Sequence, residues 1–237
     1  MVDHPLSPGG ETYAILDTNV LLPPRLSDVL FDLQQTGVYH PRWTKDIEDE
    51  FVRHWGHLVK GLKGRARKAY LAAGPHADDE QGARRRLQAY RGAVGDEFEL
   101  LGHDAEKIVQ QVPHKVDKGD KHVIAAAILL KHLLDTEGTG SDKVFVVSSN
   151  TKHLAVKEVA KMGIEVVKPG KFIDMVAQAD LNRLMQALDR SFSDLSNPPY
   201  TKSDLLEDLM LHGATATVAQ VSNAWGVSLP SGSKRKK

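Results

Sequence analysis

Three short apolar segments, separated by longer helix-like stretches, are the feature that most constrains the fold of this chain. They are residues 13–16 (YAIL), 144–147 (VFVV) and 164–167 (IEVV). Nearly continuous apolar runs of this length are typical of strands that are covered on both faces. Two weaker strand candidates occupy 38–40, where Pro41 would close the strand, and 112–116. Strands that alternate with helices predict an α/β fold with a parallel central sheet between two helical layers.

Residues with helical spacing fill the intervals between the strands and the whole region after Phe172. We expect helices in 24–36, 44–54, 98–112, 122–134 and 151–162, and helices broken near Gly74 and Pro75 in 53–91. After Phe172 we expect one helix over 173–188, a break at Pro198 and Pro199, a helix capped by Thr201 and ended by Gly213, and a last helix near 217–225. The predicted organisation is a flexible arm (1–10), an α/β domain (11–176), a C-terminal helical extension (177–230) and a basic tail (231–237).

The composition excludes several classes of protein. The chain has 237 residues, 41% of them hydrophobic and none of them cysteine, which excludes disulfides, thiolate metal sites and cysteine nucleophiles. Its longest apolar run, 123–130, is far shorter than the roughly 18 to 20 residues that a membrane span needs. The chain shows no secretion signal, so we expect a cytoplasmic protein that does not enter the membrane. A net charge of +0 gives no general attraction to nucleic acid.

Four polar residues far apart in the sequence suggest a site assembled by folding. Asp17 and Asn150 follow apolar strands, Asp120 precedes an alanine-rich helix, and Glu50 lies beside the buried face of a helix. The carboxyl ends of parallel strands share one edge of a sheet, where α/β proteins bind their ligands. Several carboxylates at one edge repel each other unless a cation or a shared proton neutralises them. The simplest resolution is a divalent metal ion.

Each of these residues also has a simpler interpretation. Asp17, Asp120 and Asn150 stand where helices begin and could be caps, while Glu50 lies in an acidic run that could be a solvated face. The sequence has neither the paired histidines of a zinc site nor a nucleotide-binding or acyl-enzyme motif. Of the eleven histidines, His122 and His132 lie near the alanine-rich helix, and we expect them at most to hydrogen-bond nearby carboxylates. Oxygen ligands alone favour Mg²⁺ or Mn²⁺.

Several segments in one order resemble the PIN domain family, and in particular its VapC-like toxins. The resemblance begins with ILDTNVL at 15–21 and covers about 13–213. Further matching segments are 26–50, 117–127 (DKGDKHVIAAA), 149–154 (SNTKHL), 163–172 (GIEVVKPGKF) and 197–206 (NPPYTKSDLL). The resemblance implies a three-layer sandwich with a parallel sheet of four to five strands.

The same resemblance implies a metal-dependent ribonuclease. It assigns the metal ligands to Asp17, Glu50 and Asp120, with Asn150 where many relatives have a fourth aspartate. Glu50 matches rather than Glu48, because the acid of the family directly precedes an aromatic residue, here Phe51. We expect supporting roles for three further residues: Asn19, Asp117 and Ser148. As partners it implies an RNA substrate, a VapB-like antitoxin whose carboxyl-terminal segment covers the groove, and a second copy of the toxin in a homodimer.

Because carboxylates repel phosphates, a separate basic surface must attract the RNA. The candidate is the basic stretch 60–91, in which we expect RNA contacts from Lys63, Arg65, Arg84, Arg85 and Arg86. A solvated helical face is the competing interpretation. For the whole chain the alternatives are a PIN nuclease of RNA processing without an antitoxin, a metal-dependent phosphatase or DNA nuclease, and a non-catalytic RNA-binding module.

Overall fold

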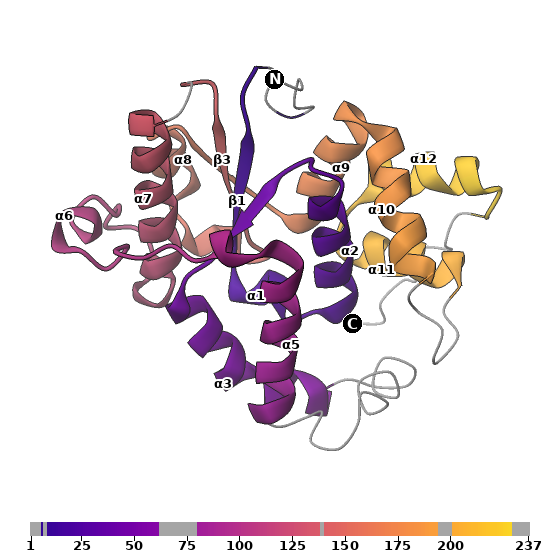
Figure 1. Cartoon of the computed structure of the whole chain (residues 1–237), viewed down its shortest axis with the longest axis horizontal. Coiled ribbons are helices and arrows are strands. Elements are labelled where there is room, and N and C mark those ends of the chain that lie inside the picture. Colours follow the sequence, from indigo (N-terminus) through magenta and orange to yellow (C-terminus); the bar gives the residue numbers. More distant parts are fainter. Residues whose placement is uncertain (1–5, 7–8, 62–79, 138–139, 194–200, 229–237) are drawn as a thin grey trace.

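A computed structural model describes residues 6, 9–61, 80–137, 140–193 and 201–228 of the chain (Figure 1). Several sequence predictions fall outside these residues. They include the RNA contacts Lys63 and Arg65, the proline pair at 198 and 199, the basic tail and most of the N-terminal arm. Among the described residues, none of the helices combines the length and the apolar character needed to traverse a lipid bilayer.

A four-stranded parallel sheet forms the centre of the protein. Its strands are β1 (Thr12–Leu16), β2 (His40–Arg42), β3 (Lys143–Val147) and β4 (Ile164–Val167), in the spatial order β2-β1-β3-β4. Leu16 pairs with Val147, which pairs in turn with Val167, so β1, β3 and β4 end in step. The three apolar segments of the sequence are confirmed as strands, and their shared ends place the residues that follow them along one edge.

Helices cover both faces of this sheet, which confirms the expected three-layer α/β arrangement. The helices before β3 are α1 (Thr18–Leu21), α2 (Pro24–Gln35), α3 (Lys45–Gly61), α5 (Glu80–Val94), α6 (Glu106–Val109) and α7 (Lys121–Glu137). Those after β3 are α8 (Val156–Ala160), α9 (Pro169–Ala179), α10 (Leu181–Ser193), α11 (Lys202–Leu211) and α12 (Thr215–Trp225). Short 3-10 helices are η1 (Asp96–Phe98), η2 (Lys118–Asp120) and η3 (Thr151–His153). Figure 1 shows α7 and α8 on one side of the strands, and α2 with α9 on the other.

The second strand begins later than the sequence indicated. β2 is His40–Arg42 rather than 38–40, and Pro41 lies inside the strand instead of closing it. The reason is that β2 lies at the edge of the sheet, where a residue without an N–H group does not interrupt the hydrogen bonds to a second neighbour.

Two predictions for the region between α5 and α7 are wrong. The segment 112–116 forms a turn instead of a strand, and the backbone N–H of Val116 donates to the carbonyl of Pro113 at 2.9 Å. The expected helix over 98–112 is reduced to the four residues of α6. The first part of the segment 98–112 is extended and lies beside Trp43. The backbone of Trp43 exchanges hydrogen bonds with Phe98 and Leu100.

The expected single helix over 173–188 is divided into α9 and α10 at Asp180. The backbone of Asp180 is not helical, and its Oδ1 accepts a hydrogen bond of 3.0 Å from the N–H of Arg183. Aspartate therefore starts a new helix here instead of continuing the previous one, as its short acceptor side chain favours. The cap by Thr201 on α11 is confirmed, since its hydroxyl accepts from the N–H of Asp204.

The C-terminal helices are packed against the α/β core through α2 and α9. α10 and α11 contact α2, while α12 contacts α9. The link to α9 is polar as well as apolar: buried Asp174 accepts hydrogen bonds of 2.8 Å from both the N–H and the hydroxyl of Thr217 in the first turn of α12. α9 therefore holds the start of the last helix in place.

Gly170 permits this close packing, and we expect Gly170→Ala to destabilise the fold. A Cβ atom at Gly170 would lie 2.3 Å from the carbonyl carbon of Gly213, in the turn between α11 and α12. Overpacking of this kind costs about 1–3 kcal/mol. Thermal unfolding should give a lower Tm for Gly170→Ala. Gly92→Ala, at an exposed helical site with nothing within 4 Å of the added carbon, should leave the Tm unchanged or raise it. Equal Tm values for the two variants would contradict this account of the packing.

Candidate metal centre

Asp17 lies at the carboxyl end of β1 and is almost completely buried, with 3% of its surface exposed. Its backbone N–H donates to the carbonyl of Val147, so the chain is still paired with β3 at this point. The side chain is oriented by two donors to Oδ2: Asn19 Nδ2 at 2.5 Å and Ser148 Oγ at 2.6 Å. Asp17 is the N-cap residue of α1, but its side chain makes no capping hydrogen bond. Side-chain capping therefore does not explain this aspartate.

Asn19 and Ser148 connect the ends of β1 and β3 around Asp17. Asn19 Nδ2 also donates to Ser148 Oγ at 3.1 Å, and Asn19 Oδ1 accepts from the N–H of Ser149 at 2.7 Å. Ser148 Oγ accepts a further hydrogen bond of 3.0 Å from the N–H of Asn150. The side chain of Asn150 is exposed and makes no capping hydrogen bond to η3. Two of the three residues expected to support the site, Asn19 and Ser148, thus contact Asp17 directly, whereas Asn150 contacts it through Ser148.

Glu50 reaches the same edge from α3. Thr18, the neighbour of Asp17, donates from its Oγ1 to Glu50 Oε2 at 2.9 Å. Two imidazoles flank the carboxylate: His122 Nε2 lies 3.5 Å from Oε2, and His54 Nε2 lies 3.7 Å from Oε1. Glu50 is therefore held beside Asp17 by groups from three helices.

Glu48, the other glutamate of the acidic run, has a structural role. It is buried, accepts a hydrogen bond of 3.0 Å from Trp43 Nε1, and forms an ion pair with Arg91. Trp43 directly follows β2 and Arg91 lies on α5, so Glu48 connects these two parts of the fold. The two glutamates thus have different surroundings. Glu48 contacts Trp43 and Arg91 in the interior, whereas Glu50 faces the edge of the sheet at which Asp17 lies.

The charges of Asp17, Glu50 and Asp120 affect one another, so the three side chains lie within one electrostatic neighbourhood. Burial raises the pKa of Asp17 above its ordinary value, and the negative charges of Glu50 and Asp120 raise it further against the hydrogen bonds from Ser148 and Asn19. Burial and the charge of Glu50 likewise raise the pKa of Asp120. By contrast, the contact with His122 and the hydrogen bond from Thr18 lower the pKa of Glu50 against the opposing effect of burial. Burial and the neighbouring acids therefore disfavour the negative charges of Asp17 and Asp120, with His153 and His122 opposing this effect at Asp120.

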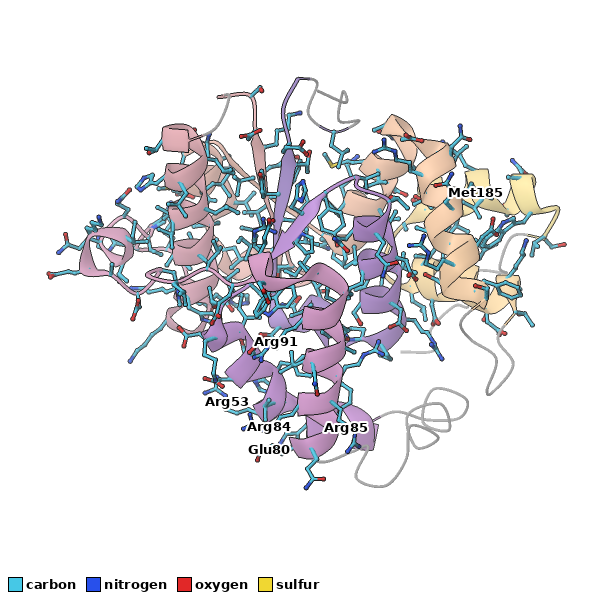
Figure 2. The ribbon with its side chains drawn as sticks, in the orientation of Figure 1. Arg53, Glu80, Arg84, Arg85, Arg91 and Met185 are labelled. Atoms are coloured by element: carbon cyan, nitrogen blue, oxygen red, sulfur yellow. The ribbon has the colours of Figure 1, made fainter. Side chains whose placement is uncertain are left out.

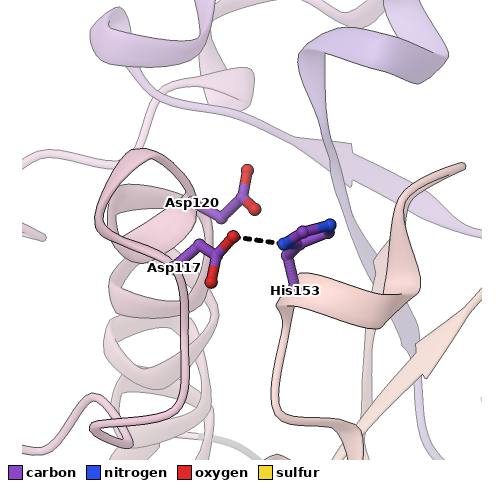
Figure 3. Close-up of side chains that lie close together, drawn as sticks. All are labelled: Asp117, Asp120 and His153. Carbon is purple, nitrogen blue, oxygen red and sulfur yellow. Dashed lines mark hydrogen bonds and ion pairs between the residues drawn. The ribbon is translucent and has the colours of Figure 1, made fainter.

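A more compact group of possible metal ligands lies at the start of α7. Asp117, Asp120 and His153 each offer one ligand atom, and these atoms lie within 4.8 Å of one another (Figure 3). His153 Nδ1 contacts Asp117 Oδ2, and the N–H of Asp117 donates to the carbonyl of His153 at 3.1 Å. Among the described residues, this is the one group of three acidic or histidine side chains that meets this distance. Asp17 and Glu50 lie outside it.

Asp120 is the residue that belongs to both neighbourhoods. It shares the compact group with Asp117 and His153, and it interacts electrostatically with Glu50 and Asp17. Within the described part of the chain, its carboxylate forms neither a hydrogen bond nor an ion pair. A half-buried carboxylate with no protein partner is chemically suited to bind a cation.

His153 is the residue of the group that sequence reasoning missed. It lies in η3, three residues after Asn150 and directly beyond the end of β3. The rule that identified Asp17 and Asn150 also applies to the first turn after a strand, and it would have included this histidine. The sequence gives no separate reason to select His153, because it is not paired with a second histidine at the spacing typical of metal ligands.

The arginines expected to bind RNA differ in their surroundings. Figure 2 shows Arg53 in the middle of α3, and Arg84 and Arg85 in the first half of α5, on the part of these helices below the strands in this view. Arg84 pairs with Glu80 on its own helix at 2.6 Å. Arg86 points inward, where it contacts Asp28 and Tyr90 Oη and thereby links α5 to α2. Arg86 therefore has a structural role, whereas Arg84 and Arg85 are exposed.

Comparison of the sequence with protein families and with curated proteins does not assign this chain to a family. No protein-family model matches the chain, and no curated protein is significantly similar to it.

Proposed function

We propose that this protein is a metal-dependent endoribonuclease whose ion lies at the acidic edge formed by Asp17, Glu50 and Asp120. One observation carries the proposal: Asp17 is a buried carboxylate that has no cationic side chain within ion-pair distance among the described residues, and it lies beside two further acids. Burying such a charge costs several kcal/mol unless a cation compensates it. Stability of the fold alone does not explain Asp17, because replacing it by a neutral residue would remove this cost and raise the free energy of unfolding.

The residues present fit a divalent ion. Asp17, Glu50 and Asp120 offer carboxylate oxygens, which suit Mg²⁺ and Mn²⁺, and the imidazole of His153 in the adjoining group makes Mn²⁺ the better match there. When bound, such an ion would lower the pKa of a coordinated water and offset the negative charge that develops on the phosphate. No protein nucleophile is needed for this chemistry.

The side chains of the protein would prepare the site for that ion. Ser148 and Asn19 fix Asp17 through Oδ2, and its Oδ1 accepts no hydrogen bond within the described residues. Thr18 fixes Glu50 in the same way from the first turn after β1. Because the donors belong to strand ends and helix starts of the core, the carboxylates are held in place before any ligand arrives, which is what efficient catalysis requires.

The choice of RNA as substrate, and of a toxin that pairs with an antitoxin, rests on the sequence resemblance to VapC-like PIN domains. On this proposal a VapB-like antitoxin would cover the acidic edge, and two copies of the chain would form a dimer. The other expectations remain as alternatives: a nuclease of RNA processing without an antitoxin, a phosphatase or DNA nuclease, and an RNA-binding module without activity.

Parallel assays on purified protein test the proposed reaction. The protein should cleave single-stranded RNA internally with Mn²⁺ or Mg²⁺, and should leave DNA and p-nitrophenyl phosphate intact. Glu50→Gln should lower kcat/KM by about 10²-fold or more, because one charge of the site is lost. Glu48→Gln should lower the Tm by removing the ion pair with Arg91, although its amide oxygen can still accept from Trp43, and cleavage per folded molecule should persist. Cleavage of DNA or of the small ester instead of RNA would overturn the choice of substrate.

We further expect the exposed arginines of α5 to contribute to RNA binding. Replacing both Arg84 and Arg85 by Gln should weaken binding and reduce the slope of log K against log salt by about 1.4, since each lost contact with single-stranded RNA reduces it by about 0.7. Fluorescence anisotropy over a salt titration measures both quantities. The matched comparison is Lys118→Gln with Lys152→Gln, two exposed lysines adjacent to the compact group. If only the lysine pair changes the slope, RNA follows the start of α7 and not α5.

A further inference from the structure

His122 occupies an unusual position among the acids. It lies in the first turn of α7, two residues after Asp120, and its side chain is 19% exposed. Its Nε2 atom is fully buried and forms no hydrogen bond within the described residues. The negatively charged partner closest to that atom is Glu50 Oε2 at 3.5 Å, an ion-pair separation that lacks the alignment of a hydrogen bond.

The fold directs this imidazole at Glu50. α7 packs against both α3 and β3, and the apolar residues that follow His122 are buried against the sheet, so the first turn of the helix has little freedom. Glu50 Oε2 is already the acceptor of Thr18 Oγ1 at 2.9 Å. The same oxygen is therefore approached by one donor from α1 and by one ring nitrogen from α7.

Several acidic groups interact electrostatically with His122. Besides Glu50, they are Asp46 on α3, Asp17 after β1 and Asp120 at the start of α7, and the charges of Glu50, Asp46 and Asp17 act on the imidazole. A buried ring nitrogen that forms no aligned hydrogen bond can cost up to about 1–3 kcal/mol. His122 retains this energetic cost and is surrounded by carboxylates. Both features favour a role for His122 at the acidic edge over a role in core packing.

We propose that His122 is a positioning residue for Glu50: its Nε2–H completes, together with Thr18, the pair of donors that fixes the Glu50 carboxylate for the ion. This inference rests on the proposed function, because it concerns the same site. Donors behind a metal ligand fix its orientation, and their loss typically weakens metal binding by about 10- to 100-fold. His54 is more exposed than His122, lies on the same helix as Glu50 and approaches the other carboxylate oxygen, Oε1, at 3.7 Å.

The test compares two substitutions that differ in the donor. His122→Leu keeps an apolar side chain against the core but removes the donor. His122→Gln retains an N–H₂ group the same number of bonds from the main chain as Nε2. Mn²⁺ affinity is measured on the whole chain without RNA, by titration calorimetry or by the electron paramagnetic resonance signal of free Mn²⁺. We expect an affinity about 10- to 100-fold weaker for His122→Leu, and within a few-fold of the unmodified protein for His122→Gln.

Controls separate positioning from general damage. His132→Leu removes an exposed histidine of the same helix and should bind Mn²⁺ like the unmodified protein. Far-ultraviolet circular dichroism and Tm values identify any variant that fails to fold. If His122→Leu binds Mn²⁺ as tightly as the unmodified protein, the inference is wrong while the proposed function stands. If His122→Gln loses the ion as completely as His122→Leu, the imidazole is itself a ligand and the positioning role is wrong. If the unmodified protein binds no Mn²⁺ and cleaves no RNA, the proposed function itself has failed.

Discussion

Asp17→Asn should abolish RNA cleavage and leave the protein at least as stable as before. The amide oxygen of asparagine can still accept the hydrogen bonds from Ser148 and Asn19, and its nitrogen replaces Oδ1, which accepts none within the described residues. Removing one charge beside Glu50 and Asp120 also relieves the repulsion that raises the pKa of Asp17. Losing a charge that the reaction needs should lower kcat/KM by about 10²- to 10³-fold or more. Cleavage assays and thermal unfolding on the same preparations measure the two effects.

The same substitution distinguishes the proposal from a non-catalytic role. If Asp17 served only the fold, Asp17→Asn would reduce stability and would change no reaction. In a bacterial host, expression of the unmodified chain should create new RNA ends and arrest growth, and Asp17→Asn should do neither. New RNA ends without growth arrest would favour a nuclease of RNA processing over a toxin. Growth arrest by both proteins would show that toxicity does not depend on this site.

Removal of divalent ions should stop cleavage, and their addition should stabilise the fold in a pH-dependent way. At an Mn²⁺ concentration 100 times the Kd, binding adds about 2.7 kcal/mol to the free energy of unfolding. For a chain of this size the Tm should rise by about 5–10 °C. Protons compete with the ion for the carboxylates, so the increase should be largest near pH 7 and should disappear in acid. Differential scanning fluorimetry with EDTA, Mg²⁺ and Mn²⁺ measures it.

The direction of the pH effect follows from the raised pKa values. The native pKa of Asp17 and of Asp120 lies above the ordinary value of about 4 for an unfolded chain. At pH values between the unfolded and the native pKa, the native state therefore binds more protons than the unfolded chain. Stability that is present below pH 4 is therefore lost as the pH rises through the native pKa. Asp17→Asn should unfold at nearly the same temperature as the unmodified protein below pH 4, and at a higher temperature near pH 7, both without ions. A Tm difference that does not depend on pH would show that Asp17 is not under electrostatic strain.

Much of the fold could be predicted because its strands have a strong local signal. β1, β3 and β4 are mostly apolar, with only Glu165 charged in β4, and helices with clear apolar periodicity follow them, which leaves a parallel sheet as the simplest arrangement. The errors fall where local and tertiary preferences compete. Pro41 lies inside β2 because an edge strand tolerates it, and Asp180 divides a periodic helical stretch because its side chain caps α10. The tolerance of Pro41 is visible only from the position of β2 at the sheet edge, whereas the cap by Asp180 is local and competes with a helical pattern that continues through it.

The site was accessible from the sequence only in part. Asp17 and Asp120 could be found because each stands at a strand end or a helix start, and Glu50 because it adjoins a buried helix face. The structural use of Glu48 by Trp43 and Arg91 could not be found, since these partners are brought together only by folding. His153 follows β3 closely enough for the strand-end rule to include it, and His122 was expected near carboxylates, but its particular partner Glu50 lies on another helix and is brought to it only by folding.

The most direct test of the central claim is anomalous diffraction from crystals soaked in Mn²⁺. The account predicts an anomalous peak bounded by carboxylate oxygens of Asp17, Glu50 and Asp120, and its loss in crystals of Asp17→Asn. A peak confined to Asp117, Asp120 and His153 that persists in Asp17→Asn, or no peak at the acidic edge at all, would contradict it.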